Sequence, residues 1–237
     1  MANAAKNPTG INLEALPMRR EPLCYLTEAE RERLSRTCSL ATIACGDAIF
    51  SQGDRADKMF LVVKGNVKVL VDGIGGRPAI VSMKAPMDFV GHRAVLASEK
   101  HSASAVALDD VTLIVVPRAE ALAVVRENPD VAAYALKGMA RALRVSRQRG
   151  VSQAQKQIRG RLAETLLSLR DKYGYTGNSR RMCIQLTREE LALLSNMTTA
   201  NAIRTLSAFA DEGLVKVSGR EVTIADEQGL EKTSQMG

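Results

Sequence analysis

A segment near the C-terminal end carries side chains suited to reading DNA. Thr198 is placed to cap a helix over residues 199–211, because its hydroxyl can accept a hydrogen bond from a first-turn amide. The face expected to be exposed offers short polar side chains and one guanidinium: Thr199, Asn201, Arg204 and Ser207. These groups match the donors and acceptors that base edges present in the major groove. The pattern predicts a recognition helix, with Thr198 also a candidate DNA contact.

The residues on either side of this segment predict a helix before it and a hairpin after it. Thr187-Arg188-Glu189-Glu190 has the form of a capping box and opens a first helix, which Ser195-Asn196-Met197 separates from the second. The buried stripe expected on the second helix is Ala202, Ile203, Leu206 and Phe209. Gly213 ends that helix. Two β-rich runs, 214–217 and 222–224, then flank Ser218-Gly219-Arg220 as a hairpin.

The hairpin decides between two interpretations of these residues. A pair of helices with no role in DNA binding is the plain alternative, but a basic-tipped hairpin directly after them favours a winged helix-turn-helix. We expect Arg188, near the start of the first helix, and Arg220, in the wing, to contact phosphates.

Charge points in the same direction. The 237 residues carry a formal net charge of +7. Residues 131–163 contain no acidic residue and eight basic ones: Lys137, Arg141, Arg144, Arg147, Arg149, Lys156, Arg159 and Arg161. The positive charges of such a tract would repel one another if it were only a solvated helix face. We therefore expect a polyanion nearby.

The sequence lacks the signatures of several other protein classes. No run of 18 apolar residues predicts a membrane span, and the N-terminus lacks the apolar core of a signal peptide. The four cysteines are scattered, which favours free thiols in a reducing cytoplasm. With no Trp and 3% aromatics, recognition by stacked bases or sugars is not expected. No nucleophile–base set, metal-spaced cluster or phosphate loop predicts an enzyme.

The upstream half is expected to be an α+β domain. Residues 1–20 look loosely ordered, and a capping box at Thr27 opens a helix to about residue 38. Glycines then punctuate short β-rich runs, which predict a barrel or roll. The runs are 48–50, 59–63, 67–71, 79–83, 104–108 and 112–116, with Gly73-Ile74-Gly75-Gly76 as a hairpin tip.

After a helix over residues 118–127, Asn128-Pro129 opens a long helix. It carries a heptad seam of small or β-branched residues for a second copy of the chain: Val131, Ala135, Gly138, Ala142 and Val145. A second stripe, expected to pack on the roll, is Leu136, Met139 and Leu143. A hinge is expected at 150–155, a helix at 157–173, and a mobile tail after Asp226.

This order of elements resembles the cAMP receptor protein / fumarate-nitrate reduction regulator (Crp/Fnr) superfamily over roughly residues 23–225. The resemblance rests on Gly46-Asp47-Ala48-Ile49-Phe50, on residues 60–69, on Asn128-Pro129-Asp130 and on residues 160–167. It implies a cyclic-nucleotide-binding-like β-roll (a double-stranded β-helix) for effector sensing over 1–127, a dimerisation helix and hinge over 128–155, and a winged helix-turn-helix over 156–237. It also implies a homodimeric transcription regulator that works with RNA polymerase.

The chain departs from the family in its effector cassette. Cyclic-nucleotide members carry Gly-Glu and, about ten residues on, Arg-Ser or Arg-Ala; the Arg pairs with the cyclic phosphate and the Glu with the ribose. Here Gly91 is followed by His92, the Arg-Ser pair is His101-Ser102, and Arg93 is a cation one place out of register. The adenine positions on the long helix correspond to Ser146 and Arg147. We therefore do not expect tight cAMP binding, and another anion or small molecule in the same pocket stays open.

The recognition helix departs from the cAMP-binding members too. Their Arg-Glu pair is Thr199-Ala200 here, while their later Arg is kept as Arg204. Arg204 is therefore the candidate for a bidentate guanine contact. The DNA half-site of those members is not expected to be matched in full.

The cysteines and histidines raise two cofactor questions. An iron–sulfur cluster needs four converging thiolates, and Cys24, Cys38, Cys45 and Cys183 are spread over the chain, so none is expected. Both histidines of the chain, His92 and His101, fall in the cassette and are the candidates for haem ligation. We prefer ordinary loop residues, or anion ligands in place of the Glu and Arg, because two histidines do not make a motif.

The sequence thus predicts a dimer that places two recognition helices about one DNA turn apart, ~34 Å, on an inverted repeat. The alternatives are a haem-dependent gas or redox sensor of the same family, and a ligand-binding module that acts on a protein partner. The latter would show little sequence preference or salt dependence on DNA.

Overall fold

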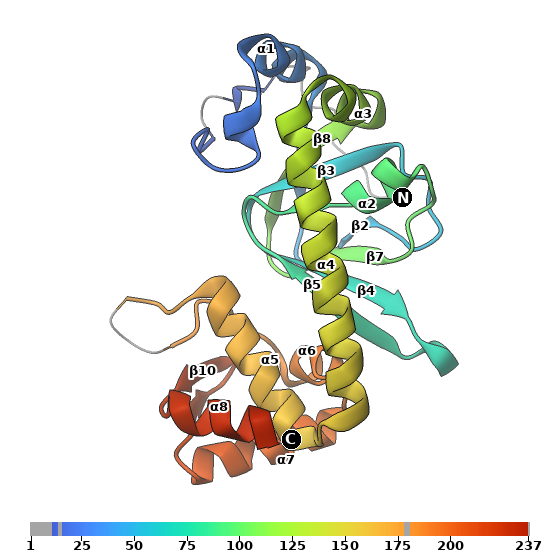
Figure 1. The fold of residues 1–237 in the computed structure, drawn as a ribbon. Coiled ribbons are helices and arrows are strands. Elements are labelled where there is room, and N and C mark those ends of the chain that lie inside the picture. The colour runs from blue at the N-terminus through green and yellow to red at the C-terminus, as the bar shows by residue number, and fades with distance from the viewer. Residues whose placement is uncertain (1–10, 14–15, 178–180, 237) are drawn as a thin grey trace. The chain divides into compact units, whose positions relative to one another are not determined.

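The computed structural model describes residues 11–13, 16–177 and 181–236. They form two compact units, the first ending at Leu143 and the second beginning at Arg144. The boundary therefore lies within the long helix α4 (Pro129–Gln155). The class is α+β, and the order is the expected one: β-roll, long helix, winged helix-turn-helix (Figure 1).

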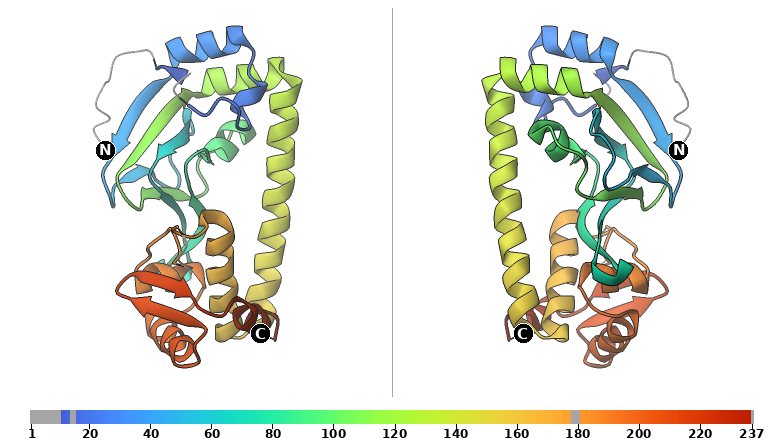
Figure 2. Two further views of the ribbon diagram at one scale, coloured as in Figure 1. Left: turned by 90° about the vertical axis from the view of Figure 1, so that its left-hand side faces the viewer. Right: turned by 90° about the vertical axis from the view of Figure 1, so that its right-hand side faces the viewer.

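The roll is made of two four-stranded antiparallel sheets (Figure 2). The first has the order β1 (Ser39–Ile43), β8 (Val111–Pro117), β3 (Lys58–Lys64) and β6 (Phe89–Val90). The second has the order β2 (Ala48–Phe50), β7 (Ser104–Ala107), β4 (Val67–Asp72) and β5 (Pro78–Lys84). A turn at Ile74–Gly76 joins β4 to β5, which confirms the expected hairpin tip.

Alternate residues of these strands form the interior of the roll. Its buried members include Phe60 and Val62 of β3 and Leu113 of β8, with small residues of β7 opposite them. The alternation follows from the two-residue period of a strand, so the periodicity that predicts the strands also selects the core face. The expected runs do not include β1 or β6; β6 has only two residues, which carry no period of their own.

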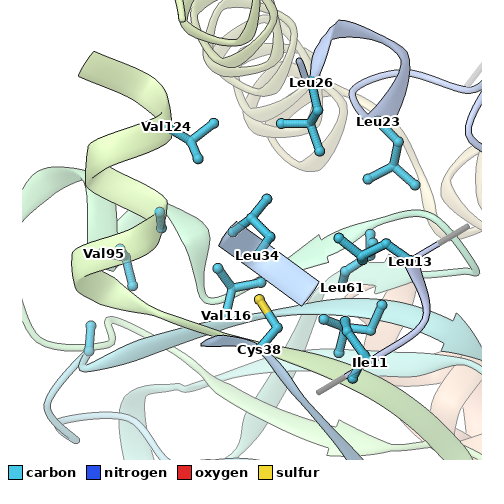
Figure 3. Close-up of a cluster of buried hydrophobic side chains, with 13 residues drawn as sticks. Ile11, Leu13, Leu23, Leu26, Leu34, Cys38, Leu61, Val95, Val116 and Val124 are labelled. Atoms are coloured by element: carbon cyan, nitrogen blue, oxygen red, sulfur yellow. The ribbon is translucent and has the colours of Figure 1, made fainter. Parts of the chain in front are cut away.

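A second core of this unit lies where helices cover the roll (Figure 3). It joins α1 (Glu28–Thr37), α3 (Arg118–Glu127), strands β3 and β8, and the segment leading to α1, which includes a 3₁₀ turn at Leu23–Tyr25. Ile11 and Leu13 are 8% and 4% exposed and belong to this core. The expectation of a loosely ordered start is therefore wrong for residues 11–13; residues 1–10, 14 and 15 lie outside the described residues.

One buried amide fixes the start of α4. The Asn128 Oδ1 accepts hydrogen bonds from the backbone amides of Asp130 and Val131, both at 3.1 Å, and so caps the helix. Its Nδ2 donates to the Tyr25 carbonyl at 2.9 Å and to a carboxylate oxygen of Glu30 at 2.8 Å. The expected helix start is confirmed, and Asn128 ties it to α1 and to the segment before α1.

Three apolar residues of α4 are placed differently from the expectation. Leu136 and Leu143 are 71% and 60% exposed, so these two members of the stripe assigned to the roll do not pack on it. Val131, from the seam assigned to a second copy, instead packs against the core of its own unit. The first half of α4 passes α2 (His92–Ala97), which lies between it and the strands of the roll (Figure 2).

The hinge expected at residues 150–155 does not interrupt α4. The helix continues to Gln155, and the chain turns only at Lys156 and Gln157, before α5 (Ile158–Tyr173). A lapse of the apolar pattern changes which residues are buried, but it leaves the backbone hydrogen bonds of a helix intact.

The second unit contains α5, α6 (Arg188–Leu194), α7 (Thr199–Asp211), β9 (Val215–Ser218), β10 (Glu221–Ile224) and α8 (Glu227–Met236). The tail expected to be mobile is the helix α8. Leu230 of α8 is fully buried, and the helix packs against α5. Because Glu227 and Glu231 of α8 both pair with Arg170, a side chain of α5 helps to order the polar tail.

Candidate functional site

Helix α7 has the geometry expected of a recognition helix. The Thr198 hydroxyl accepts a hydrogen bond from the Asn201 amide at 3.2 Å, which confirms the predicted cap. Thr198, Thr199, Arg204 and Ser207 are exposed, and Asn201 is half-buried. The buried face is Ala202, Thr205, Leu206 and Phe209.

Ile203 is not part of that buried face. It is 46% exposed, and Thr205 is buried instead. With 3.6 residues per turn, a residue four places after Thr199 and four before Ser207 lies on the side those two share. The predicted stripe is therefore wrong at this position, and an apolar side chain lies among the polar ones.

Arg204 is oriented by its neighbour on the helix. Its Nη2 donates to the Asn201 Oδ1 at 2.6 Å. The guanidinium keeps further N–H donors, and a planar guanidinium held at one corner can present them as a pair to the O6 and N7 of guanine.

Buried contacts fix the turn between α6 and α7. Met197 is buried, and the buried Ser195 hydroxyl hydrogen bonds to the Thr165 hydroxyl of α5 at 2.9 Å. At the start of α6 the Glu190 amide donates to the Thr187 hydroxyl at 3.1 Å, and the Glu190 carboxylate accepts from the Thr187 amide at 2.9 Å. The capping box is confirmed, and both helices are held against α5.

The wing is the hairpin β9–β10, with Gly219 and Arg220 as its turn. Gly219 has a φ of +55°, which favours glycine at this turn. The Arg188 Nη2 donates to the Gly219 carbonyl at 2.6 Å, so this guanidinium holds the tip of the wing. Arg220 is exposed. The phosphate roles of both residues stay predictions.

The basic tract is less one-sided in space than in sequence. Arg159 pairs with Glu212, at the C-terminal end of α7, at 2.7 Å, and Lys156 pairs with Glu164 at 3.3 Å. Self-repulsion is therefore reduced by acids from outside residues 131–163, which corrects the argument from the tract alone. Arg159 also lies over the Phe209 ring at 5.0 Å and so helps to join α5 to the recognition helix.

In the effector cassette of the roll, the His101 ring is buried against an aromatic ring. The His101 ring is 5% exposed and stacks on Phe50 with 3.8 Å between ring centroids. Gly91 has a φ of +75°, and a Cβ there would lie 2.9 Å from the His101 Cε1. Glycine is therefore required at position 91 both by the backbone and by the histidine ring.

Both histidines are uncharged at neutral pH. Burial, together with the charges of Lys84 and Arg93, lowers the pKa of His92 to about 4. Burial also lowers the pKa of His101. Arg93 and Ser102 are exposed beside them, and Ser146 and Arg147 are exposed on α4 in the other unit. His101 thus supplies no positive charge at the position where the resemblance places an arginine.

The cysteines are placed very differently from one another. Cys38 is 1% exposed, and burial, reinforced by Glu120, raises its pKa to about 12. Cys24, Cys45 and Cys183 are exposed. Within residues 11–13, 16–177 and 181–236, no group of three or more His, Cys, Asp or Glu side chains is arranged to hold a metal ion. In the same ranges no helix is long and apolar enough to cross a membrane.

Comparison with known proteins agrees with this geometry. A cyclic nucleotide-binding domain matches residues 41–128, and a Crp-like helix-turn-helix domain matches residues 160–233. The "Cyclic AMP receptor protein" of Thermus thermophilus is 30% identical over 188 residues, 79% of this chain and 84% of that protein. The "CRP-like cAMP-activated global transcriptional regulator" of Mycobacterium tuberculosis is 24% identical over 191 residues, 80% of this chain and 85% of that protein.

Among solved structures, FixK2 from Bradyrhizobium japonicum shares the fold, with a TM-score of 0.74 and 21% identity. The match covers 83% of this chain and 96% of that one. A β-roll joined through a long helix to a winged helix-turn-helix defines a DNA-binding transcription regulator rather than an enzyme. The chain belongs to the Crp/Fnr family.

Proposed function

We propose that this regulator is a homodimer that binds an inverted repeat of DNA and works with RNA polymerase in the cytoplasm. The observation that supports dimerisation is the pair Leu136 and Leu143, two large apolar side chains exposed seven residues apart on α4. A seven-residue apolar repeat is the spacing at which two helices pack along a seam. The partner that fits is a second α4, because a helix with this stripe is complementary to itself under two-fold symmetry.

We propose further that the effector of the roll is a small molecule other than cAMP. A cyclic phosphate needs a cation, and the neutral His101 stands where the cassette would carry one. Of the proposed cassette residues, Arg93 supplies the positive charge beside Gly91, His92 and Ser102. Ser146 and Arg147 remain proposed effector contacts from α4. The names of the Thermus and Mycobacterium relatives state their use of cAMP, and these positions argue against extending it to this chain.

The test is selection of binding sites from a random duplex DNA pool with the full-length protein, followed by salt titration on the enriched sequence. We expect an inverted repeat with half-site centres about one helical turn apart. Affinity should fall steeply as salt rises, because phosphate contacts release counterions. No enrichment with little salt dependence would contradict the proposal and favour a module acting on a protein partner.

A haem-dependent sensor is the second candidate, because the Nδ1 of His92 is buried without a hydrogen-bond partner and its imidazole is neutral. A neutral imidazole is the form that binds iron. The measurement is an absorption spectrum of protein purified without oxygen and then mixed with haem. A saturable Soret band lost in His92→Ala or His101→Ala would support haem. A featureless spectrum without stoichiometric uptake would exclude it.

A further inference from the structure

Ile203 is an apolar side chain on the recognition face, and the polar contacts described above give it no role. Ile203 is 46% exposed on α7, and Ala200, one turn before it, is exposed as well. The polar residues Thr199 and Ser207 lie one turn before and after Ile203, and Arg204 follows it directly. The buried side of α7 is filled by other residues, including Leu206 and Phe209, so the core of the unit does not require an isoleucine here.

The major groove offers one apolar group to such a side chain. Among the four bases only thymine carries a methyl group on its major-groove edge, whereas the other edge groups are hydrogen-bond donors and acceptors. A branched aliphatic side chain can bury that methyl, but it would leave the polar edges of cytosine or guanine without a partner.

We propose that Ile203 reads the 5-methyl group of a thymine in the operator. The inference rests on the proposed DNA-binding function and adds a base preference to it. Adjacent residues of a helix differ by 1.5 Å along its axis, less than the ~3.4 Å between base pairs. The thymine therefore lies within about two base pairs of the guanine assigned to Arg204, and each half of the inverted repeat contains both.

The experiment replaces thymine with deoxyuridine, which removes the methyl group and keeps every hydrogen-bonding atom. Duplexes of the selected operator are made with one such replacement at a time, placed symmetrically in both half-sites, and titrated with the full-length protein. At the position read by Ile203 we expect a loss of about fourfold for each methyl, the value for one apolar carbon withdrawn from water. At the other thymines the loss should be much smaller.

Ile203→Ala identifies the residue responsible. Because the side chain is exposed, this variant is expected to fold. It should bind the operator with thymine and the operator with deoxyuridine at that position with nearly equal affinity. Val81→Ala is the matched control, since Val81 is a 41% exposed β-branched residue of β5, in the first unit. It should keep the full preference for thymine.

Three results would overturn the inference. If no deoxyuridine replacement changes affinity while Arg204→Ala still loses its guanine preference, the DNA-binding function stands and the methyl contact is wrong. If Ile203→Ala weakens binding to both duplexes equally, the side chain supports the helix and does not read a base. If the selection enriches no sequence, the proposed function fails and this inference fails with it.

Discussion

Arg204 and Arg220 carry the same charge but have different expected roles. Arg204 lies on the recognition helix and is held by Asn201, whereas Arg220 lies in the two-residue turn of the wing. A guanidinium aimed at a base edge distinguishes sequences, while one aimed at a phosphate does not. The two residues therefore form a matched pair for separating specificity from affinity.

We predict that Arg204→Ala costs about 1–3 kcal/mol on the best operator and relaxes the preference at one base position. Arg220→Ala should weaken binding about equally on all sequences and reduce the salt slope by about 1. Both are measured by titration against the operator and its single-base variants at several salt concentrations. A uniform loss in Arg204→Ala would show that Arg204 contacts a phosphate.

His92 makes the stability of the first unit depend on pH. Its pKa is about 4 in the folded protein and about 6.5 in an unfolded chain. Below pH 6.5 the unfolded state therefore binds a proton that the folded state does not. The unfolding free energy of the first unit is not reduced by His92 above pH 6.5, and it falls as the pH is lowered from 6.5 towards 4. Lys84, Arg93 and Asp88 also contribute to this pKa, and burial contributes most.

We predict that His92→Gln removes up to about 3 kcal/mol of the fall in unfolding free energy between pH 6.5 and pH 4. The measurement is urea unfolding of the wild type and the variant across that range. Parallel pH profiles for the two proteins would show that His92 is not the group responsible.

At the scale of elements, α8 shows how a polar segment becomes ordered. Its sequence looked like a tail, yet Leu230 fills a site in the core of the second unit and Arg170 pairs with Glu227 and Glu231. A short helix of this composition gains little from propensity alone, so its order depends on packing against α5.

Leu230→Ala should therefore lower the unfolding free energy of the second unit by about 2–5 kcal/mol, the cost of emptying a buried leucine site. Met236→Ala, at the 85% exposed end of the same helix, is the control and should stay within about 0.5 kcal/mol. Hydrogen exchange of the α5 and α8 amides reports this locally. Equal protection in both variants would mean that α8 does not stabilise the unit.

At the scale of the whole molecule, the proposed dimer depends on the exposed face of α4. Leu136 and Leu143 are exposed in the single chain, so changing them should not disturb the fold of a protomer. Val131, on the face first assigned to the partner, already packs on its own unit.

We predict that the double variant Leu136→Glu, Leu143→Glu sediments as a single chain of 25.6 kDa, while the wild type sediments as a dimer. Introducing four carboxylates into one seam combines desolvation with like-charge repulsion. DNA affinity should fall by the contribution of the second half-site. Val81→Glu, at an exposed position of the roll, is the control and should remain dimeric. A dimeric double variant would place the interface elsewhere.

Much of this protein followed from the sequence because its signals are local. The capping boxes at Thr27 and Thr187, the alternation along β3 and β8, and the proline after Asn128 each act within a few residues. The winged helix-turn-helix followed in the same way, since a cap, a break and a hairpin turn are all short motifs.

The tertiary structure decided which side of an element is buried and what its polar groups meet. Ile203 and Leu136 are exposed and Thr205 is buried, although helical spacing allowed the opposite in each case. The acids that pair with Arg159 and Lys156 and the ring that stacks on His101 come from other elements. The periodicity of a sequence indicates that a helix has an apolar face. The width and direction of that face depend on the neighbouring elements, which only the tertiary structure brings together.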